Sequence, residues 1–392
     1  GQNPVFEAYV RTLFDPNGRY SNRFFYDKLG RNVVSQNARQ FNELDVFGDS
    51  QERKFSYYIF DALGRVIEAG EKLENSTTNS QFSNIFGTTV SGLYNSSVID
   101  DSKLLAWISG DGARHEVTKS YYDETLIIGL PTDFTPNVLT QRKRITHVTY
   151  EEEFDGNDQT FDHATHYDYD IHGNVKTILQ DNKKMADEFA SIATQRFKRM
   201  DYTYDLISGN VHRMSVQNGD IDQWHHAYRY DSDNRITHAY TNDQTPILDN
   251  DILSQSLENE LTQNSDWQQE AAYFYYDHGS LARTEFGNDQ LQGCDYVYNL
   301  HGFIKGVNSI SLDVTIDPGA DGLNTSVNAP FAKDVYGFSL HYYEDDYLAI
   351  NGTGQNHAAS VNPNSHAAQN STTNDLFNGN IRFMQRHTRC YF

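Results

Sequence analysis

One motif recurs along the 392 residues: an aromatic residue, an aspartate, two or three variable residues, and then a glycine or asparagine. The copies include FFYDKLGRN (24–32), YIFDALGRV (58–66), YDYDIHGNV (167–175) and YTYDLISGNV (202–211). Alternating aromatic and polar residues precede the turn, and a short strand-like run follows it. Each copy therefore predicts a β-hairpin, in which a tight turn joins two strands.

The turn chemistry explains why the motif keeps its form. Asp27 is at the first turn position, where its carboxylate can accept backbone N–H groups. Gly30 supplies the left-handed conformation that a type I turn followed by a bulge requires. Later copies put Asn234 at the glycine position and Asn299 at the aspartate position, which keeps the turn but removes an acid or base. The motif is therefore interpreted as structural, and no catalytic residue is assigned. The turn residues are Tyr26, Asp27, Gly30, Asp61, Gly64, Tyr169, Asp170, Gly173, Tyr204, Asp205, Gly209, Tyr230 and Asp231.

Composition indicates an all-β fold. Tyr and Phe favour strands, and the chain has 26 Tyr, 23 Phe and 26 Gly against 8 Pro. The aromatic residues before the turns are irregularly spaced, which indicates hairpin repeats with inserted loops. They are Tyr26, Phe60, Tyr122, Tyr169, Tyr204, Tyr230, Tyr276 and Tyr298.

The insertions are polar and are expected to be surface loops, at 74–84, 238–267 and 350–375. One or two short helices are expected in insertions. The first candidate is 183–200, with apolar residues at Met185, Phe189, Ile192 and Phe197. The second begins near Asp249 or Asp251.

Charge and cysteine content exclude some classes of protein. The net charge of -23 disfavours nucleic acid and anionic membranes as partners. Cys294 and Cys390 are too few for a disulfide framework. No apolar stretch reaches the length of a membrane span, so membrane insertion is not expected. The chain is predicted to be a fragment of a longer protein, because it starts at Gly1 without a leader and ends without a polar tail.

The ordered series of motifs resembles the YD repeats of the Rhs family, which includes Rhs toxins, the TcC components of toxin complexes and the teneurins. Rhs-type proteins of Bacteroidetes are particularly similar. The resemblance spans about residues 20–386. It includes FFYDKLGRNVVSQNARQ, YIFDALGRVIEAGEK, YDYDIHGNVKTILQDN, YRYDSDNRITHAY and YVYNLHGFIKGVNS.

The resemblance implies hairpins in a spiralling sheet that forms a hollow shell or part of one. Residues 1–392 would then be one shell segment, with repeats over 20–345 and a loop-rich segment that precedes the family core over 346–392. The implied role is structural, in a secreted or cell-surface protein that encloses or presents a C-terminal effector or toxin. The expected partners are that effector domain, or other shell or secretion components. The family's self-cleaving core is not matched, and no protease residue is assigned to IDPGADGLN (316–324).

The sequence signals for a metal site or a catalytic site are weaker than the signal of the repeated motif. His163 and His166 are three apart in a predicted strand, so they face opposite sides and do not form a metal site. His225 and His226 are adjacent in a predicted strand, so they also face opposite sides and do not form a metal site. No cofactor is expected, although calcium could bind the acidic loops at 154–162, 248–253 and 317–322. Cys294 is interpreted as a buried small residue, and no nucleophile motif indicates an enzyme. The alternative function is an adhesin or carbohydrate-binding module without enclosed cargo, which would expose an aromatic patch.

Overall fold

The computed structural model describes residues 13–14, 21–37, 40, 53–74, 101–110, 112–123, 129–157, 159–189, 194–244, 261, 266–309, 312–343, 346–347 and 376–388. Over these ranges the chain is almost entirely antiparallel β-structure with two short helices, so the predicted all-β fold is confirmed. The chain divides into two compact units, Gly1–Met200 and Asp201–Phe392.

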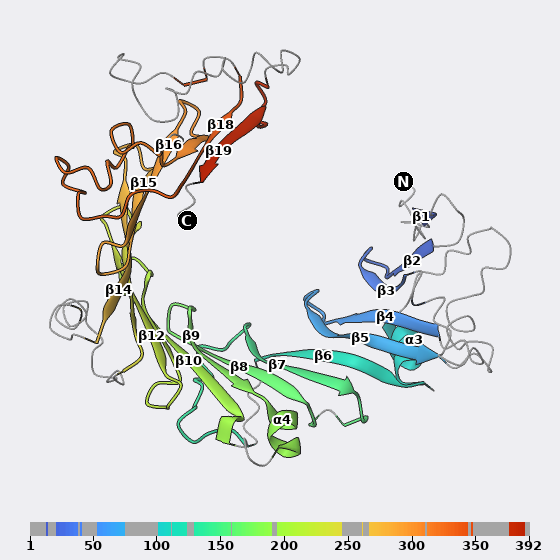
Figure 1. The fold of residues 1–392 in the computed structure, drawn as a ribbon. Coiled ribbons are helices and arrows are strands. Elements are labelled where there is room, and N and C mark those ends of the chain that lie inside the picture. The colour runs from blue at the N-terminus through green and yellow to red at the C-terminus, as the bar shows by residue number, and fades with distance from the viewer. Residues whose placement is uncertain are drawn as a thin grey trace. The chain divides into compact units, whose positions relative to one another are not determined.

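In the first unit, successive strands pair as an antiparallel meander (Figure 1). The strands are β1 (Leu13–Phe14), β2 (Ser21–Tyr26), β3 (Asn32–Gln36), β4 (Arg53–Phe60), β5 (Val66–Glu74), β6 (Arg114–Tyr122), β7 (Ile145–Glu153), β8 (His163–Tyr169) and β9 (Val175–Asp181). The motif turns join β2 to β3, β4 to β5 and β8 to β9. They therefore lie at the same edge of the sheet, because alternate connections of a meander share an edge.

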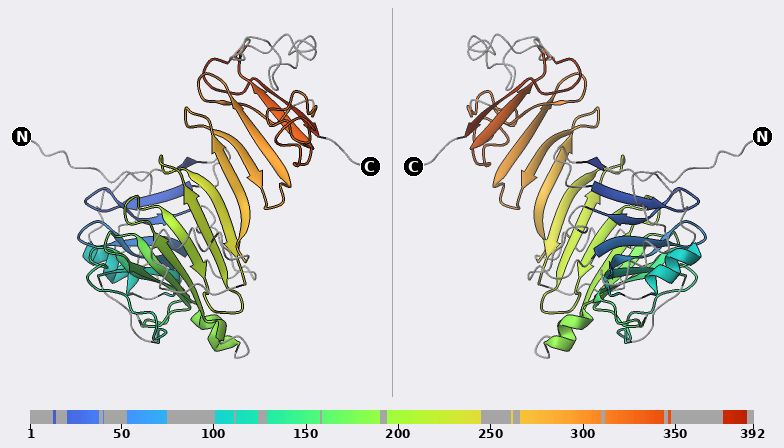
Figure 2. Two further views of the ribbon diagram at one scale, coloured as in Figure 1. Left: turned by 90° about the vertical axis from the view of Figure 1, so that its left-hand side faces the viewer. Right: turned by 90° about the vertical axis from the view of Figure 1, so that its right-hand side faces the viewer.

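The second unit continues the same pattern, and the division between the units falls within β10 (Phe197–Tyr204). Its other strands are β11 (Val211–Val216), β12 (Trp224–Tyr230), β13 (Ile236–Asn242), β14 (Gln268–Tyr275), β15 (Leu281–Phe286), β16 (Gln292–Tyr298), β17 (Ile304–Val307), β18 (Tyr336–His341) and β19 (Phe383–Thr388). From β11 onward each strand pairs antiparallel with the next (Figure 2).

The strands bury one face more than the other. Burial alternates residue by residue along β8, β16 and β18. This alternation is expected where an antiparallel sheet has one covered face and one face toward solvent. The side-chain pattern therefore fixes the register, since a one-residue slip would turn the buried set outward.

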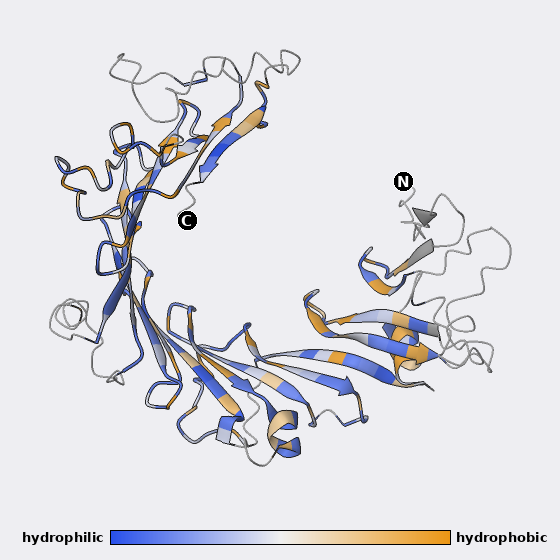
Figure 3. Ribbon diagram, in the orientation of Figure 1, coloured by the Kyte–Doolittle hydropathy of each residue, from blue (hydrophilic) through white to orange (hydrophobic). Residues whose placement is uncertain are grey.

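The largest apolar core lies where α3 (Asp101–Ile108) covers strands of the first unit (Figures 1 and 3). Leu104, Trp107 and Ile108 lie on one helix face. The Trp107 ring makes T-shaped contacts with the rings of Phe55 and Tyr57, at 5.7 and 6.4 Å between ring centroids. The apolar spacing of three and four residues in DSKLLAWI is the sequence signal for this helix. This helix was not predicted from the sequence, because its eight residues provide only a weak signal without the strands that pack against them.

A buried lysine fixes the end of α3. Lys72 on β5 has no exposed surface, and its Nζ donates to the carbonyl oxygens of Ile108 and Gly110 at 3.0 and 2.9 Å. The Trp107 indole N–H donates to Glu74 Oε1 at 2.6 Å. A cation at the carbonyl end of a helix satisfies free acceptors and interacts favourably with the helix dipole.

The helix expected over 183–200 is wrong in extent. Helix α4 covers Lys183–Glu188, and residues from Phe197 onward form β10. The alternating residues FKRMDYTY lead directly into the turn at Asp205, so this segment forms a strand and not the end of a helix. Of the second helix candidate, 245–260 lie outside the described residues.

Candidate functional site: hairpin junctions and an acidic cluster

The first motif turn shows which contact each of its residues makes. The Asp27 carboxylate accepts the backbone N–H groups of Leu29 and Arg31, both at 2.9 Å. The Gly30 N–H donates to the Asp27 carbonyl at 3.1 Å, and Gly30 has a φ of +78°. The pairing of β2 with β3 shifts register between Phe25 and Tyr26, just before the turn, which is the bulge of this hairpin type.

The other turns repeat this geometry with the residue changes seen in the sequence. Asp61, Asp170 and Asp231 each accept backbone N–H groups two and four residues later. The left-handed residues are Gly64 at +81°, Gly173 at +96°, Gly209 at +74° and Asn234 at +62°. In the longer turn, the Asp205 carboxylate accepts the N–H and hydroxyl of Ser208, and Tyr204 ends the strand before it. Asn299 accepts the N–H groups of His301 and Phe303, both at 3.0 Å.

The turn between β14 and β15 corrects one assignment. Tyr276 occupies the aspartate position, because its N–H donates to the Ser280 carbonyl and its carbonyl accepts the Gly279 N–H, both at 2.8 Å. The tyrosine that precedes this turn is therefore Tyr275. Choosing Tyr276 was wrong by one residue, because the aspartate of YFYYDHG is one place later than in the other copies.

Each turn is also joined to the next hairpin, through a set of contacts that we call a hairpin junction. In the clearest example, Arg235 Nε donates to Asp231 Oδ2 at 2.7 Å. The same guanidinium lies 4.5 Å from the ring centroid of Tyr275, one hairpin further along the chain. The Tyr275 hydroxyl then donates to the Ile236 carbonyl at 2.8 Å. The junction therefore uses the turn's ion pair, a cation–π contact and a hydrogen bond.

Other hairpins share the hydrogen bond of this junction, and two of those below also share its cation–π contact. In each of them, the tyrosine hydroxyl donates to a backbone carbonyl of the preceding hairpin. The acceptor residue follows the position that is equivalent to Arg235. The pairs are Tyr122 with Val66 at 3.5 Å, Tyr169 with Ile145 at 2.8 Å, Tyr230 with Val211 at 2.8 Å and Tyr342 with Ile304 at 2.8 Å. The Cζ atom of Arg65 lies 3.8 Å from the ring centroid of Tyr122, and that of Arg144 lies 5.5 Å from the ring centroid of Tyr169. Phe60 lies on Arg31 at 4.4 Å and has no hydroxyl to donate.

The protonation states suit these contacts. The backbone N–H of Arg235, and then its side chain, lowers the pKa of Asp231 below its ordinary value, so this carboxylate stays charged. Burial raises the pKa of Tyr275, so its hydroxyl keeps the proton that it donates. The motif's polar groups are thus used in the turn and in the contact with the next hairpin.

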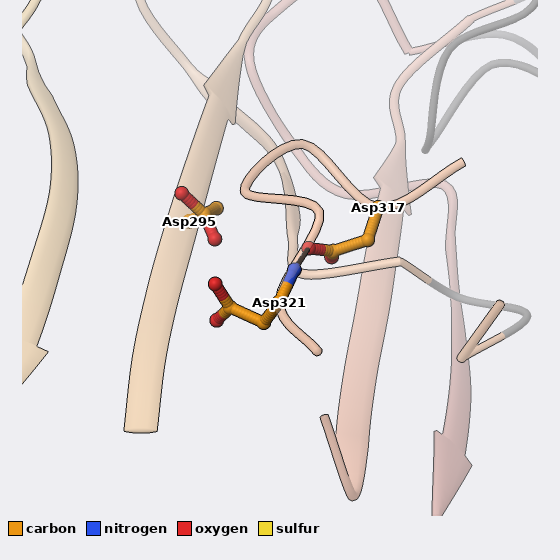
Figure 4. Close-up of side chains that lie close together, drawn as sticks. All are labelled: Asp295, Asp317 and Asp321. Carbon is orange, nitrogen blue, oxygen red and sulfur yellow. Dashed lines mark hydrogen bonds between the residues drawn. The ribbon is translucent and has the colours of Figure 1, made fainter. Parts of the chain in front are cut away.

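A second group of side chains, the acidic cluster, comprises Asp295, Asp317, Asp321 and Asp334. Asp295 lies on β16, and Asp317, Asp321 and Asp334 lie on the connection between β17 and β18. Figure 4 shows Asp295, Asp317 and Asp321. Oxygens of Asp295, Asp317 and Asp321 all lie within 4.8 Å of one another. Arg283 donates to Asp295 Oδ2 at 2.6 Å and to Asp321 Oδ1 at 2.7 Å. Of the proposed calcium loops, only 317–322 contributes to such a group among the described residues, and 248–253 lies outside them.

Burial dominates the electrostatics of this cluster. It raises the pKa of Asp295 to about 6, against the opposing charge of Arg283. It also raises the pKa of Asp334, and the hydrogen bond and charge of Asp317 raise it further. The Asn308 amide donates to Asp334 Oδ1 at 2.8 Å. The sequence does not show that these residues lie together. Asp295 and the loop that contains Asp317 are more than twenty residues apart in the chain, and they become neighbours only when the strands pair.

The histidine pairs do not converge. His163 is exposed and His166 is buried on β8, and His225 has no exposed surface on β12. Burial lowers the pKa of His166 and of His225 to about 4, so both are neutral at pH 7. The two residues of the first pair lie on opposite faces of a strand, which is the geometry expected of residues three apart.

One buried chain of polar groups has the residue types of a nucleophile and its base. Ser339 Oγ lies 3.0 Å from His341 Nε2, and Lys305 Nζ lies 3.0 Å from His341 Nδ1 and 2.6 Å from Asp346 Oδ1. Ser339 has no exposed surface, so a substrate cannot reach its hydroxyl. Burial also raises the pKa of the Cys294 thiol, which disfavours the reactive thiolate. Cys390 lies outside the described residues, and the absence of enzymatic activity stays a prediction.

Neither helix that the structure describes is long enough and apolar enough to cross a membrane. No protein-family model matches the chain. No curated protein matches it either.

Solved structures that resemble the chain include two toxin complexes. The crystal structure of TcdB2-TccC3-Cdc42 matches at 12% identity and a TM-score of 0.27, and the Photorhabdus luminescens Tc holotoxin pore at 13% and 0.28. Each match covers 74% of this chain and 13% of the toxin chain. A porin-like protein from Bacteroides uniformis matches at 9% identity and a TM-score of 0.21, over 66% of this chain and 82% of its own. Scores this low carry no argument about function, which is argued below from the chain itself.

Proposed function

We propose that this chain is a structural YD-repeat wall segment of a secreted or cell-surface Rhs-like protein, which encloses or presents a C-terminal effector. The observation that supports this proposal is that the motif residues are occupied by contacts within the turn and with the next hairpin. Asp231, Arg235 and Tyr275 form bonds within one turn and between one hairpin and the next. Repeated junctions of this kind extend a sheet hairpin by hairpin, which is what a wall requires.

The sheet edges also suit this role. An edge strand with free N–H and C=O groups promotes aggregation. In a continuous meander, each of the strands β12 to β18 has a hydrogen-bonded neighbour on both sides. A wall built in this way can grow without adding free edges, since each new hairpin covers the previous one.

Protease protection tests the proposal. The gene product that contains this chain and the polypeptide after residue 392 would be treated with protease, and the downstream polypeptide alone would serve as the control. We expect the downstream polypeptide to resist digestion in the intact protein and to be digested when made alone. Equal digestion rates, or a gene that encodes nothing further, would contradict enclosure. Binding of the 392-residue chain to a glycan array would instead favour the carbohydrate-binding alternative.

A further inference from the structure

The acidic cluster places four carboxyl groups beside the guanidinium of Arg283. Asp295, Asp321 and Asp334 are 5%, 1% and 5% exposed, and Asp317 is half-buried beside them. Arg283 is the cation that pairs with this cluster, and it also donates to Glu285 at 2.8 Å. Burying carboxylates is costly unless a cation or hydrogen-bond donors accompany them.

A separate observation indicates what the cluster lacks. Asp321 Oδ1 accepts from Arg283, but the buried Asp321 Oδ2 has no hydrogen-bond partner among the described residues. Asp317 Oδ1 is also buried, and the neighbour that could donate to Asp317 is the carboxyl group of Asp334, when that group carries its proton. An acceptor held in the interior without a donor is destabilising, and a metal ion is a ligand that would satisfy it.

Two glycines allow these oxygens to approach the strand. A Cβ at Gly293 on β16 would clash with Arg283 and Asp321 Oδ2, and a Cβ at Gly319 would clash with Arg283 and Asp295 Oδ2. A side chain at either position would therefore displace these carboxylates and the guanidinium, so the two glycines leave the space that the cluster occupies. The Asp321 N–H donates to Asp317 Oδ2 at 3.3 Å, which holds the two loop carboxylates together (Figure 4).

We propose that Asp295, Asp317 and Asp321 bind a calcium ion. Calcium is coordinated by oxygen ligands at 2.3–2.6 Å, so two oxygens on one ion are at most about 5 Å apart. One oxygen from each of these three residues meets this limit, since the three atoms all lie within 4.8 Å of one another. Carboxylates are hard ligands, and calcium tolerates the irregular geometry that a strand and a loop provide, whereas magnesium demands a near-ideal octahedron.

Such an ion would join the connection between β17 and β18 to β16. Residues 312–335 of this connection contain no strand or helix, and loops of this length need other interactions to be ordered. The ion would supply them at Asp317 and Asp321. The inference does not depend on the proposed function, since a wall segment and an adhesin could both contain the site.

Calorimetric titration of the full chain with CaCl₂, after treatment with a chelator, tests the proposal. We expect saturable binding of one calcium ion, weakened at least tenfold in Asp317→Asn, and at least tenfold weaker binding of MgCl₂. Asp313→Asn is the matched control, because Asp313 is an exposed carboxylate in the same connection that bonds to Thr315. Its affinity should remain within twofold of the wild type.

Three results would overturn the proposal: no saturable calcium binding, equal loss in Asp313→Asn, or equal affinity for magnesium. If Asp317→Asn does not fold, hydrogen exchange on the wild-type chain decides the matter. Calcium should then slow exchange in residues 293–335 more than in the rest of the described chain. A uniform effect, or none, would refute a site at this place.

Discussion

The hairpin junction makes a quantitative prediction at Tyr275. Tyr275→Phe keeps the ring over Arg235, 4.5 Å from the guanidinium, and removes only the hydroxyl that donates to Ile236 at 2.8 Å. A hydrogen bond of this kind contributes about 0.5–1.5 kcal/mol. The cost should lie toward the upper end, because the substitution also leaves the Ile236 carbonyl without this donor. We therefore expect a loss of about 1–1.5 kcal/mol in the free energy of unfolding.

A larger substitution separates the two parts of the junction. Tyr275→Leu also removes the cation–π contact, which contributes about 0.5–1 kcal/mol at a partly exposed site. A double-mutant cycle with Arg235→Gln should recover a coupling of that size, about 0.5–1 kcal/mol. With Tyr275→Phe the coupling to Arg235 should stay close to that of the wild type, since the ring is still present.

Urea unfolding monitored by circular dichroism, with hydrogen exchange in β13 and β14, measures these losses. The local measurement is needed because a repeat array does not always unfold in one step. Tyr228→Phe is the control: this ring stacks on His226 at 6.4 Å, and no hydrogen bond from its hydroxyl is present in the described structure. If Tyr275→Phe costs no more than Tyr228→Phe, the junction does not hold the hairpins together.

The remaining predictions concern single positions in other hairpins. Phe60→Tyr should stabilise the first unit by up to about 1 kcal/mol in urea unfolding, because the new hydroxyl would supply the bond that this junction lacks; a loss would refute the equivalence of the junctions. Gly64→Ala should cost about 1–2 kcal/mol because Gly64 has a φ of +81°, and Gly64→Asn should cost less, since Asn234 adopts this conformation. Burial, and then the charge of Arg196, lowers the pKa of His166 to about 4 from an ordinary value of 6.5. The stability that neutral His166 contributes is thus present above pH 6.5 and is lost as the pH falls toward 4. Urea unfolding at pH 7 and pH 5 should show a loss of about 2 kcal/mol from this group, which His166→Phe should abolish; an unchanged difference would contradict the assignment.

The turns could be predicted from sequence because their requirements are local. Asp27 and Gly30 are three residues apart, and the hydrogen bonds and backbone conformation of the turn depend on little else. The motif did not predict the role of the tyrosine hydroxyl, because its acceptor belongs to the preceding hairpin. Tyr275 and Ile236 are 39 residues apart, and the length of the insertion between them varies from hairpin to hairpin.

Non-local packing also explains the helix errors. The segment 183–200 has apolar residues at helical spacing, yet the turn at Asp205 needs a strand before it, so the helix ends at Glu188. Helix α3 is stabilised by contacts with Phe55 and by the bonds from Lys72, both distant in sequence. Its own eight residues provide only a weak signal, since a helix this short is marginal without packing.

The acidic cluster was the least predictable feature. The loop 317–322 was one of three acidic segments with similar composition, and nothing local distinguished it. What distinguishes it is the neighbouring strand, where Arg283 and Asp295 face the loop across β15 and β16. A reader of the sequence would need the pairing of these strands before recognising the group.

The hairpin junction has a consequence for how such a chain can change its length. Each junction joins one turn to the next hairpin only, as Arg235 does with Tyr275. Removal or duplication of a whole hairpin would therefore leave a turn and a following hairpin at the new boundary that can still meet. Loss of a single strand would not, because the turn and the tyrosine would then lie at opposite edges of the sheet. A gene of this kind can gain or lose sequence in hairpin-sized pieces without redesign of the remaining contacts.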